Sequence, residues 1–271
     1  MTIDKSVLVC GIGETASATA RRLHGEGYAV AIFRATAPRL LRRRMSYADV
    51  WFDGFATLDG VEARRADVAC EFLLGLQTRS FIPLLRQQLR DVLGRWPFDA
   101  IVACREDEEP LPPSLIDLAE ITIGLGPGFT PGGHCDLVIE TEGLDPGAIL
   151  RAGDAPSRSR DAEPHASRIV FAPSKGLFRA QSAIGATVEE GDLLGHIGET
   201  RVVAPIGGRI KGLARREQAV DDGAPVAEIA FACAARVTGV SDRNQMIARS
   251  VAFAIEMECE GWTPAPFESW S

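Results

Sequence analysis

A repeat at a fixed offset of 32 residues constrains the second half of this chain more than any other feature. The stretch VFAPSKGLFRAQ, residues 170–181, returns in similar form as VVAPIGGRIKGL, residues 202–213. Matches continue without a gap: Ala172 with Ala204, Pro173 with Pro205, Gly176 with Gly208, Phe178 with Ile210, Val188 with Val220, Gly191 with Gly223, Leu194 with Val226 and Ile197 with Ile229. So many matches in one register indicate a single structural unit used twice.

Each copy consists of short apolar runs closed by a glycine turn, EEGD or DDGA, which is a pattern typical of strands. One copy cannot bury its apolar face alone, whereas two copies related by a pseudo-twofold axis can close a small all-β barrel. Residues 169–231 resemble the flattened, hammerhead barrel of biotinyl and lipoyl domains. The hairpin between the copies has Glu199, Thr200 and Arg201 at its tip, and Lys175 and Lys211 are expected to lie away from it. We therefore expect no covalent biotin or lipoate.

The first 150 residues alternate strand and helix patterns, which predicts an α/β, Rossmann-like layer domain over 1–150. Strands are predicted at 7–10, 28–33, 99–104, 121–126 and 135–141, with further β-like stretches near 48–54 and 60–66. Helices are predicted at 14–27, 81–93 and 114–120. The polar segment 151–168 is predicted to be a linker. An amphipathic helix over 241–258, within a C-terminal region of 236–271, is expected to pack on the body or on a partner.

Composition and charge exclude several classes of protein. The formal net charge of −8 gives no reason to expect a nucleic acid or a membrane surface as a partner. Six cysteines without a CxxC pair, and four dispersed histidines, predict neither a disulfide framework nor a metal site. No segment reaches the roughly 20 apolar residues that span a bilayer, so we expect a cytoplasmic protein.

The first candidate site is the turn GIGETA between the first predicted strand and helix. Gly11 and Gly13 allow the backbone to approach a phosphate, and the helix N-terminus beside Thr15 favours an anion. Glu14 opposes a phosphate at this place. Arg34, at the end of the second strand, would suit the 2′-phosphate of NADP.

A basic run is the second candidate. If the run is helical, Arg39 and Arg43 share a face. With Arg42 and Arg44 they could bind phosphate, or form a solvated surface.

The third candidate is the loop GLGPGFTPGGHCD, residues 124–136, directly after a predicted strand. Loops at the carboxyl ends of strands are where α/β sheets bind ligands. If the first and fourth strands are parallel, this loop and the first turn would open into one crevice. Its candidate ligand-binding residues are Gly126, Gly128, Phe129, Thr130, Gly132, His134 and Cys135, with Asp136 as a further polar group. No pattern identifies a catalytic base or nucleophile.

Three stretches together resemble the YqeB-like proteins, which are accessory to selenium-dependent molybdenum hydroxylases. These stretches, which fall within 5–231, are VLVCGIGETASATARRLHGEGYAVAIF, IGLGPGFTPGGHCDLVIET and LLGHIGETRVVAPIGGRIKGL. The resemblance implies a role in maturing or inserting a molybdenum cofactor, or in supplying its sulfur or selenium ligand.

The leading hypothesis is an accessory protein that binds a small anionic, phosphate-bearing cofactor, such as a molybdopterin derivative. Its barrel would dock a client molybdenum enzyme or another protein partner. Two alternatives stay open: an NADP-dependent oxidoreductase that uses Arg34, and a non-catalytic assembly subunit with the barrel and the C-terminal helix as interfaces, including a homo-oligomer.

Overall fold

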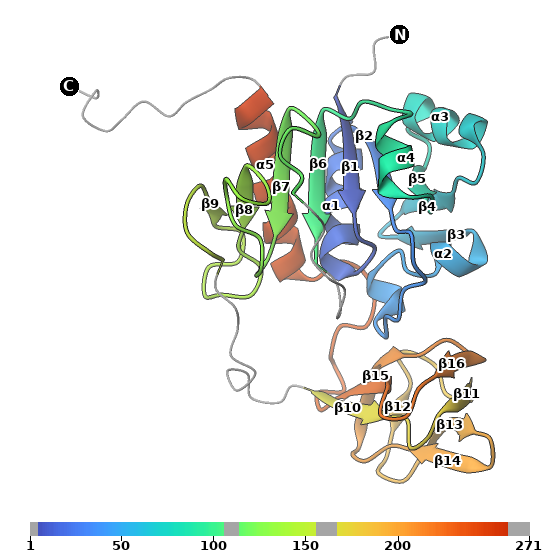
Figure 1. Cartoon of the computed structure of the whole chain (residues 1–271). Coiled ribbons are helices and arrows are strands. Elements are labelled where there is room, and N and C mark those ends of the chain that lie inside the picture. The colour runs from blue at the N-terminus through green and yellow to red at the C-terminus, as the bar shows by residue number, and fades with distance from the viewer. Residues whose placement is uncertain (1–4, 106–113, 156–166, 260–271) are drawn as a thin grey trace.

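The chain is a mixed α/β protein with one large sheet, two small antiparallel sheets and a C-terminal helix (Figure 1). This computed structural model describes residues 5–105, 114–155 and 167–259. The strands of the large sheet are β1 (Ser6–Cys10), β2 (Ala29–Phe33), β3 (Phe55–Leu58), β4 (Val61–Arg65), β5 (Ile82–Leu85), β6 (Ala100–Cys104), β7 (Ile121–Leu125), β8 (Leu137–Ile139) and β9 (Ile149–Leu150). The helices are α1 (Glu14–Gly25), α2 (Val50–Asp53), α3 (Ala69–Thr78), α4 (Leu89–Leu93) and α5 (Asp242–Cys259), with a 3₁₀ turn at Arg43–Met45.

The large sheet is parallel except at its two edges. Its strand order is β3-β4-β5-β2-β1-β6-β7-β8-β9, and only β3 and β9 pair antiparallel with their neighbours. The central strands are buried on both faces because helices or loops cover both, which explains their continuous apolar runs. The carboxyl ends of β1, β6, β7 and β8 therefore meet at one edge of the sheet. The strand before the first glycine turn, β1, and the strand before the long glycine loop, β7, run parallel with β6 between them, which meets the condition for a common crevice.

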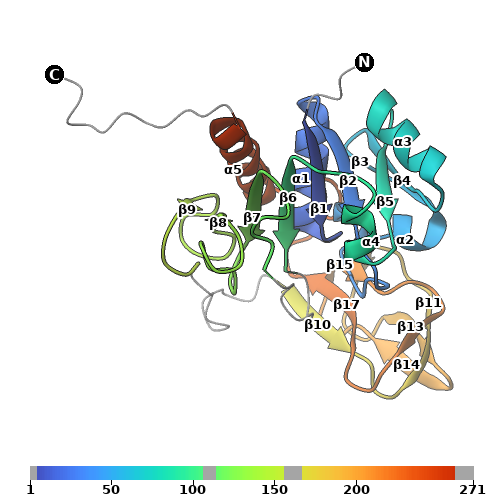
Figure 2. The same cartoon turned by 45° about the horizontal axis from the view of Figure 1, so that its top comes forward.

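The C-terminal helix belongs to the large sheet. The apolar side chains of Ile247, Val251 and Ile255 are buried in the same core as Val7 and Val9 of β1. Helix α5 lies beside α1, and Figures 1 and 2 show both on one face of the sheet, with α3 and α4 on the other. Of the two expected positions for this helix, the structure shows packing on the body.

Three elements of the first half differ from the prediction. The helix predicted over 81–93 is wrong: Ile82–Leu85 is a buried parallel strand between β2 and β4, and α4 begins only at Leu89. The strand pattern at 48–54 is instead the four-residue helix α2, which Gly54 ends with a φ of 89°. Residues 114–120 form turns and bends, so the helix predicted there is also wrong.

Helix α3 was not predicted from the sequence, and it carries no clear apolar stripe. Leu73 and Leu74 are exposed, whereas Leu76 is buried, so apolar residues occur on its exposed side as well as on its buried side. Because a one-sided stripe is the main signal for a surface helix, the sequence pattern gave little indication of this one.

The repeated half forms two four-stranded antiparallel sheets. Their strands are β10 (Ser167–Phe171), β11 (Gly176–Ala180), β12 (Thr187–Val188), β13 (Leu193–Ile197), β14 (Thr200–Val203), β15 (Gly208–Leu213), β16 (Gln218–Val220) and β17 (Pro225–Ala230). The sheet orders are β10-β17-β15-β12 and β14-β13-β11-β16. The 32-residue offset exchanges β10 with β14, β11 with β15, β12 with β16 and β13 with β17, so it converts one order into the other. Each sheet therefore contains strands from both copies, and neither copy can form alone.

Close packing explains the repeated glycine. A Cβ on Gly176 would lie 2.6 Å from Cγ2 of Ile197. A Cβ on Gly208 would lie 3.0 Å from Cγ2 of the equivalent Ile229 and 2.2 Å from the carbonyl oxygen of Ala230. Both copies thus need a residue without a side chain at the same place.

Lys175 lies near the start of the hairpin between the two copies. It shares a surface hollow of about 360 Å³ with Ile197 and Gly198, which precede the tip residues Glu199, Thr200 and Arg201. Its Nζ lies 3.4 Å from a carboxylate oxygen of Asp221. The pairing of β11 with β13 brings the start of the first copy beside this hairpin, which explains the position of Lys175.

Candidate functional site

A polar cavity of about 470 Å³ lies at the carboxyl edge of the large sheet. It is bounded by the first turn of α1, by the chain after β6, β7 and β8, and by the start of α5. Its lining residues are Glu14, Thr15, Arg42, Cys104, Arg105, Leu125, Pro127, Thr141, Glu142, Ser241, Arg243 and Asn244. The residues that follow Gly13 and those that flank Gly126 therefore line the same space.

The first glycine turn is closed by backbone hydrogen bonds. The amide of Gly11, with a φ of 132°, donates to the carbonyl of Phe33 at 3.0 Å, and Gly13 precedes α1 as its N-cap. Glu14 is the acidic residue in the first turn of α1, where a negative charge complements the helix dipole. A carboxylate of the protein itself therefore stands at the helix end that the sequence suggested for a phosphate.

Arg42 joins this turn to the repeated module. Its guanidinium donates to both carboxylate oxygens of Glu228 on β17, at 2.6 Å each, and to Glu14 at 3.1 Å. Glu228 is only 3% exposed, and it also accepts a hydrogen bond from the hydroxyl of Ser167 at 2.7 Å. Burial by itself would raise the pKa of Glu228, but the hydrogen bonds and charge of Arg42 outweigh it, so the pKa is lowered.

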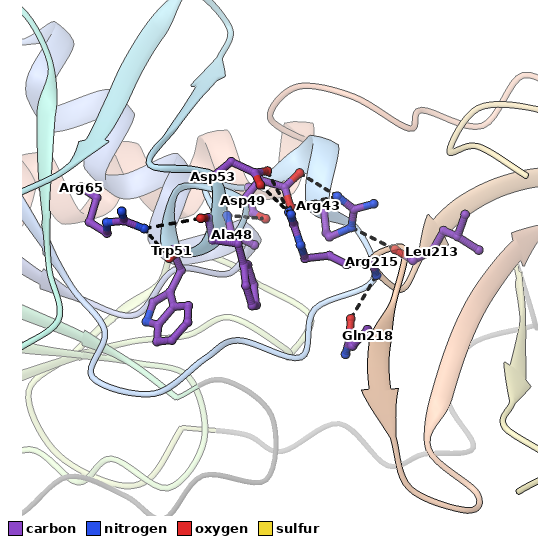
Figure 3. A network of polar contacts seen from close by, with 11 residues as sticks. Arg43, Ala48, Asp49, Trp51, Asp53, Arg65, Leu213, Arg215 and Gln218 are labelled. Atoms are coloured by element: carbon purple, nitrogen blue, oxygen red, sulfur yellow. Dashed lines mark hydrogen bonds and ion pairs between the residues drawn. The ribbon is translucent and has the colours of Figure 1, made fainter. Parts of the chain in front are cut away.

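The rest of the arginine run holds the large sheet and the module together. Arg43 donates to the carbonyl of Leu213 at 3.0 Å and pairs with Asp49 at 2.7 Å (Figure 3). From the module, Arg215 pairs with both Asp49 and Asp53. The segment contains only a 3₁₀ turn at Arg43–Met45, so the condition under which Arg39 and Arg43 would share a helix face is not met. Neither residue lines the cavity.

Arg34 lies away from the cavity as well. Its side chain is 6% exposed, and its Nε donates to the carbonyl of Thr36 at 3.2 Å. The backbone of Arg34 is also bonded, through its amide to Leu85 and through its carbonyl to the indole of Trp51. The geometry thus uses Arg34 to fix the chain after β2.

The long glycine loop divides between the cavity and the core. At the cavity, Leu125 and Pro127 flank Gly126, whose φ is 90° and whose absent Cβ would lie 2.5 Å from the hydroxyl of Thr141. After Gly128, the chain turns to the opposite face of the sheet. There the ring of Phe129 is buried against Gly124, where a Cβ would lie 2.4 Å from it.

The other residues of this loop that were predicted to bind a ligand contact other parts of the protein instead. Cys135 is buried in the core of that opposite face, and burial raises the pKa of its thiol to about 11. Thr130 donates to Asp154, the amide of Gly132 to the carbonyl of Cys135, and the ring of His134 meets that of Phe129 edge to face. None of these residues lines the cavity.

Several cavity residues were not predicted. Thr141 ends the predicted strand at 135–141 and Glu142 follows it, so their place at the carboxyl edge could have been inferred. Cys104 and Arg105 likewise end or follow β6. No local signal places Ser241, Arg243 and Asn244 here, because this requires knowing that α5 packs beside α1. The hydroxyl of Thr15 donates to the side-chain oxygen of Asn244 at 3.2 Å, which fixes the two helix starts together.

Fold and site define a class: an α/β layer protein with a two-copy β module between β9 and α5 and an arginine-lined cavity at the carboxyl edge of its sheet. No family model matches the chain. A curated protein of Escherichia coli (strain K12), named "Uncharacterized protein YqeB", is 32% identical over 257 residues, which cover 93% of this chain. The chain belongs to the YqeB-like family. It spans about half, 47%, of the length of that relative.

The match extends beyond the residues that carried the resemblance. The match covers 93% of the chain, which is a longer stretch than residues 5–231. The similarity therefore reaches into α5. Among solved structures, the urea carboxylase of Kluyveromyces lactis matches 29% of this chain and 8% of its own, with 22% identity and a TM-score of 0.22. That score is too low to bear on the fold. Within the described residues, no helix combines the length and the apolar character needed to cross a bilayer.

Proposed function

We propose that this chain is an accessory protein that binds a small phosphate-bearing cofactor in the 470 Å³ cavity. As the resemblance to the YqeB-like proteins implies, its role would be the maturation of a molybdenum cofactor or its insertion into a molybdenum hydroxylase. The cofactor would then be a molybdopterin derivative, and the β module would dock the client enzyme. The relative's name assigns no function, so the chemistry of the cavity must support this proposal.

One observation carries the proposal: the starts of α1 and α5 and the loop after β7 line a single polar cavity that also contains three arginines. A volume of this size falls in the range of about 300–1,000 Å³ usual for small-molecule sites. Arginine forks suit phosphate oxygens, and the carboxyl edge of a parallel sheet is where such folds bind ligands. A molybdopterin derivative carries phosphate together with amino groups, which the polar lining could hold.

The proposal extends to the fold types. The parallel β2-β1-β6-β7 arrangement with α1 between β1 and β2 supports a Rossmann-like layer. The exchange of strands between the two small sheets supports a biotinyl/lipoyl-like hammerhead barrel without a prosthetic group. The hairpin tip carries Glu199, Thr200 and Arg201 in place of a modifiable lysine. Because Lys175 shares a surface hollow with Ile197 and Gly198 of this hairpin, an intact-mass measurement is the control for the absence of a prosthetic group.

Mass spectrometry of the protein purified from a host that makes molybdenum hydroxylases tests the function. We expect a phosphate-bearing pterin to be released on denaturation, in an amount that approaches one per chain. A Pro127→Trp variant, which fills the cavity, should release much less while keeping the melting temperature of the wild type. Release of no phosphate-bearing molecule from folded wild-type protein would contradict the proposal.

The alternative of an NADP-dependent oxidoreductase has no comparable support, because Arg34 lies outside the cavity and is bonded to its own segment. Titration with NADPH, followed by its fluorescence, tests that alternative. We expect no saturable change.

A further inference from the structure

The three arginines of the cavity differ in how far their charge is already used. Arg42 is paired with Glu14 and with both oxygens of the buried Glu228. Arg105 and Arg243, in contrast, have no carboxylate or carbonyl partner among the residues that the structure describes. The positive charge available to a ligand therefore comes from Arg105 and Arg243.

These two arginines come from different elements that line the same cavity. Arg105 directly follows β6, and Arg243 is the second residue of α5, where it is only half-buried. Ser241 and Asn244, at the start of this 18-residue helix, line the same cavity, and the hydroxyl of Ser241 accepts a hydrogen bond from the amide of Asn244 at 3.3 Å. The first turn of α1, by comparison, already holds the Glu14 carboxylate.

The cavity also contains two acids on its wall, Glu14 and Glu142. A carboxylate accepts about four hydrogen bonds, so Glu14 keeps acceptor capacity beyond its single bond from Arg42. These acids weaken the binding of a ligand that carries only phosphate, although the two arginines still attract it. A ligand that also carries hydroxyl or amino groups would donate to them.

We propose that the ligand of this cavity is a phosphorylated molecule with hydroxyl or amino donors, and that its phosphate binds Arg105 and Arg243 rather than the glycine turn before α1. This inference rests on the proposed function and specifies the ligand of the same site. Glu142 and Glu14 then accept from the donor groups. The phosphate end of the ligand thus meets positively charged side chains, and the end with donor groups meets negatively charged ones.

Calorimetric titration of the full chain with inorganic pyrophosphate tests the phosphate position. We expect Arg243→Ala and Arg105→Ala each to weaken binding by about 10-fold or more, since each removes a charge-assisted contact. Arg243→Lys should retain part of the affinity, because the charge stays while the fork is lost. Arg249→Ala on the exposed side of α5 is the matched control and should bind like the wild type.

The outcomes separate the two proposals. If pyrophosphate binds the wild type and both alanine variants equally, the assignment to Arg105 and Arg243 is overturned and the anion-binding cavity stands. If the wild type does not bind pyrophosphate, the proposed function itself falls, and this inference falls with it. Thermal melting of each variant shows whether a loss reflects unfolding, and Arg243→Lys then gives the answer for an alanine variant that fails to fold.

The acidic wall is tested in a second arm. Glu142→Gln should leave pyrophosphate affinity unchanged or raise it, because a repulsive charge is removed. The same variant should release less of the ligand that co-purifies with the wild type, since that ligand loses an acceptor. An undiminished amount of released ligand would overturn the role of Glu142.

Discussion

The arginines between residues 39 and 44 make different kinds of contact, although they are close in sequence. Arg42 and Arg43 both contact the module, and neither has its charge free for a ligand. Arg39 is 71% exposed at its side chain and lies 3.6 Å from Asp221. Arginines that the sequence analysis treated as one candidate site therefore have separate structural roles.

Removing Arg42 should destabilise the protein strongly. Arg42→Ala leaves the carboxylate of Glu228 buried without its partner, and breaking such a pair costs about 3–5 kcal/mol. Urea unfolding at pH 7 measures the change. Arg39→Ala is the control, and a salt bridge as exposed as that one should cost at most about 1 kcal/mol. Equal losses for the two variants would contradict the role of Arg42.

The lowered pKa of Glu228 predicts a dependence on pH. Because its pKa is lower in the folded state than its ordinary value of 4.5, the ion pair contributes its full stability above that value. The contribution is lost as the pH falls through the lowered value. Glu228→Gln should therefore show a shallower loss of unfolding free energy than the wild type as the pH falls below about 4.5. Parallel curves for the two proteins would show that the pair is not formed.

The thiols should react in an order set by burial. Burial raises the pKa of Cys10 to about 12 and that of Cys135 to about 11, whereas Cys70 and Cys233 are exposed. Since the thiolate is the reactive form, iodoacetamide at pH 8 should label Cys70 and Cys233 first. Peptide mapping after timed labelling measures the order. Early labelling of Cys10 in folded protein would contradict its placement.

At the scale of elements, α5 is part of the core of the large sheet. Ile255 is fully buried on this helix, while Phe253, two residues earlier, is 52% exposed. We expect Ile255→Ala to lower the unfolding free energy by about 2–5 kcal/mol, because it leaves a cavity in the core. Phe253→Ala should change it by no more than about 0.5 kcal/mol. Denaturant unfolding compares the two, and similar small effects would show that α5 is not packed on the sheet.

Elements with a strong period or a repeat were predictable, and those fixed by tertiary pairing were not. The 32-residue offset indicated two interlocking copies, and the buried strand patterns at 7–10, 99–104 and 121–126 correspond to β1, β6 and β7. The spacing of Ile82, Leu85, Leu89 and Val92 resembles a helix because a short buried strand and a short helix happen to adjoin. Burial between β2 and β4 decides in favour of the strand, and no local pattern contains that pairing.

The candidate site was predictable in its location rather than in its residues. Glycine turns at two carboxyl strand ends indicated the correct edge of the sheet, since parallel strands end together. The second half of the loop, from Phe129 to Cys135, packs under the opposite face because Gly124 leaves room for the phenyl ring. That exchange of space between residues five apart cannot be inferred from glycine content.

At the scale of the whole molecule, the site depends on the return of the chain after the module. The large sheet supplies β1 to β9, the module follows, and α5 then packs beside α1 (Figures 1 and 2). Thr15 and Asn244 meet across 229 positions of sequence. Arg42 lines the cavity and also pairs with Glu228 of the module, so a single side chain links the site to the module.

We propose that the first turn of α1, the loop after β7 and the start of α5 enclose one ligand. A crystal structure of the protein as isolated from a host that makes molybdenum hydroxylases tests it most directly. We predict density for a phosphate-bearing molecule between Thr15 and Pro127, with its phosphate against Arg243. A cavity filled by the protein's own side chains, or a ligand bound elsewhere on the molecule, would contradict this account.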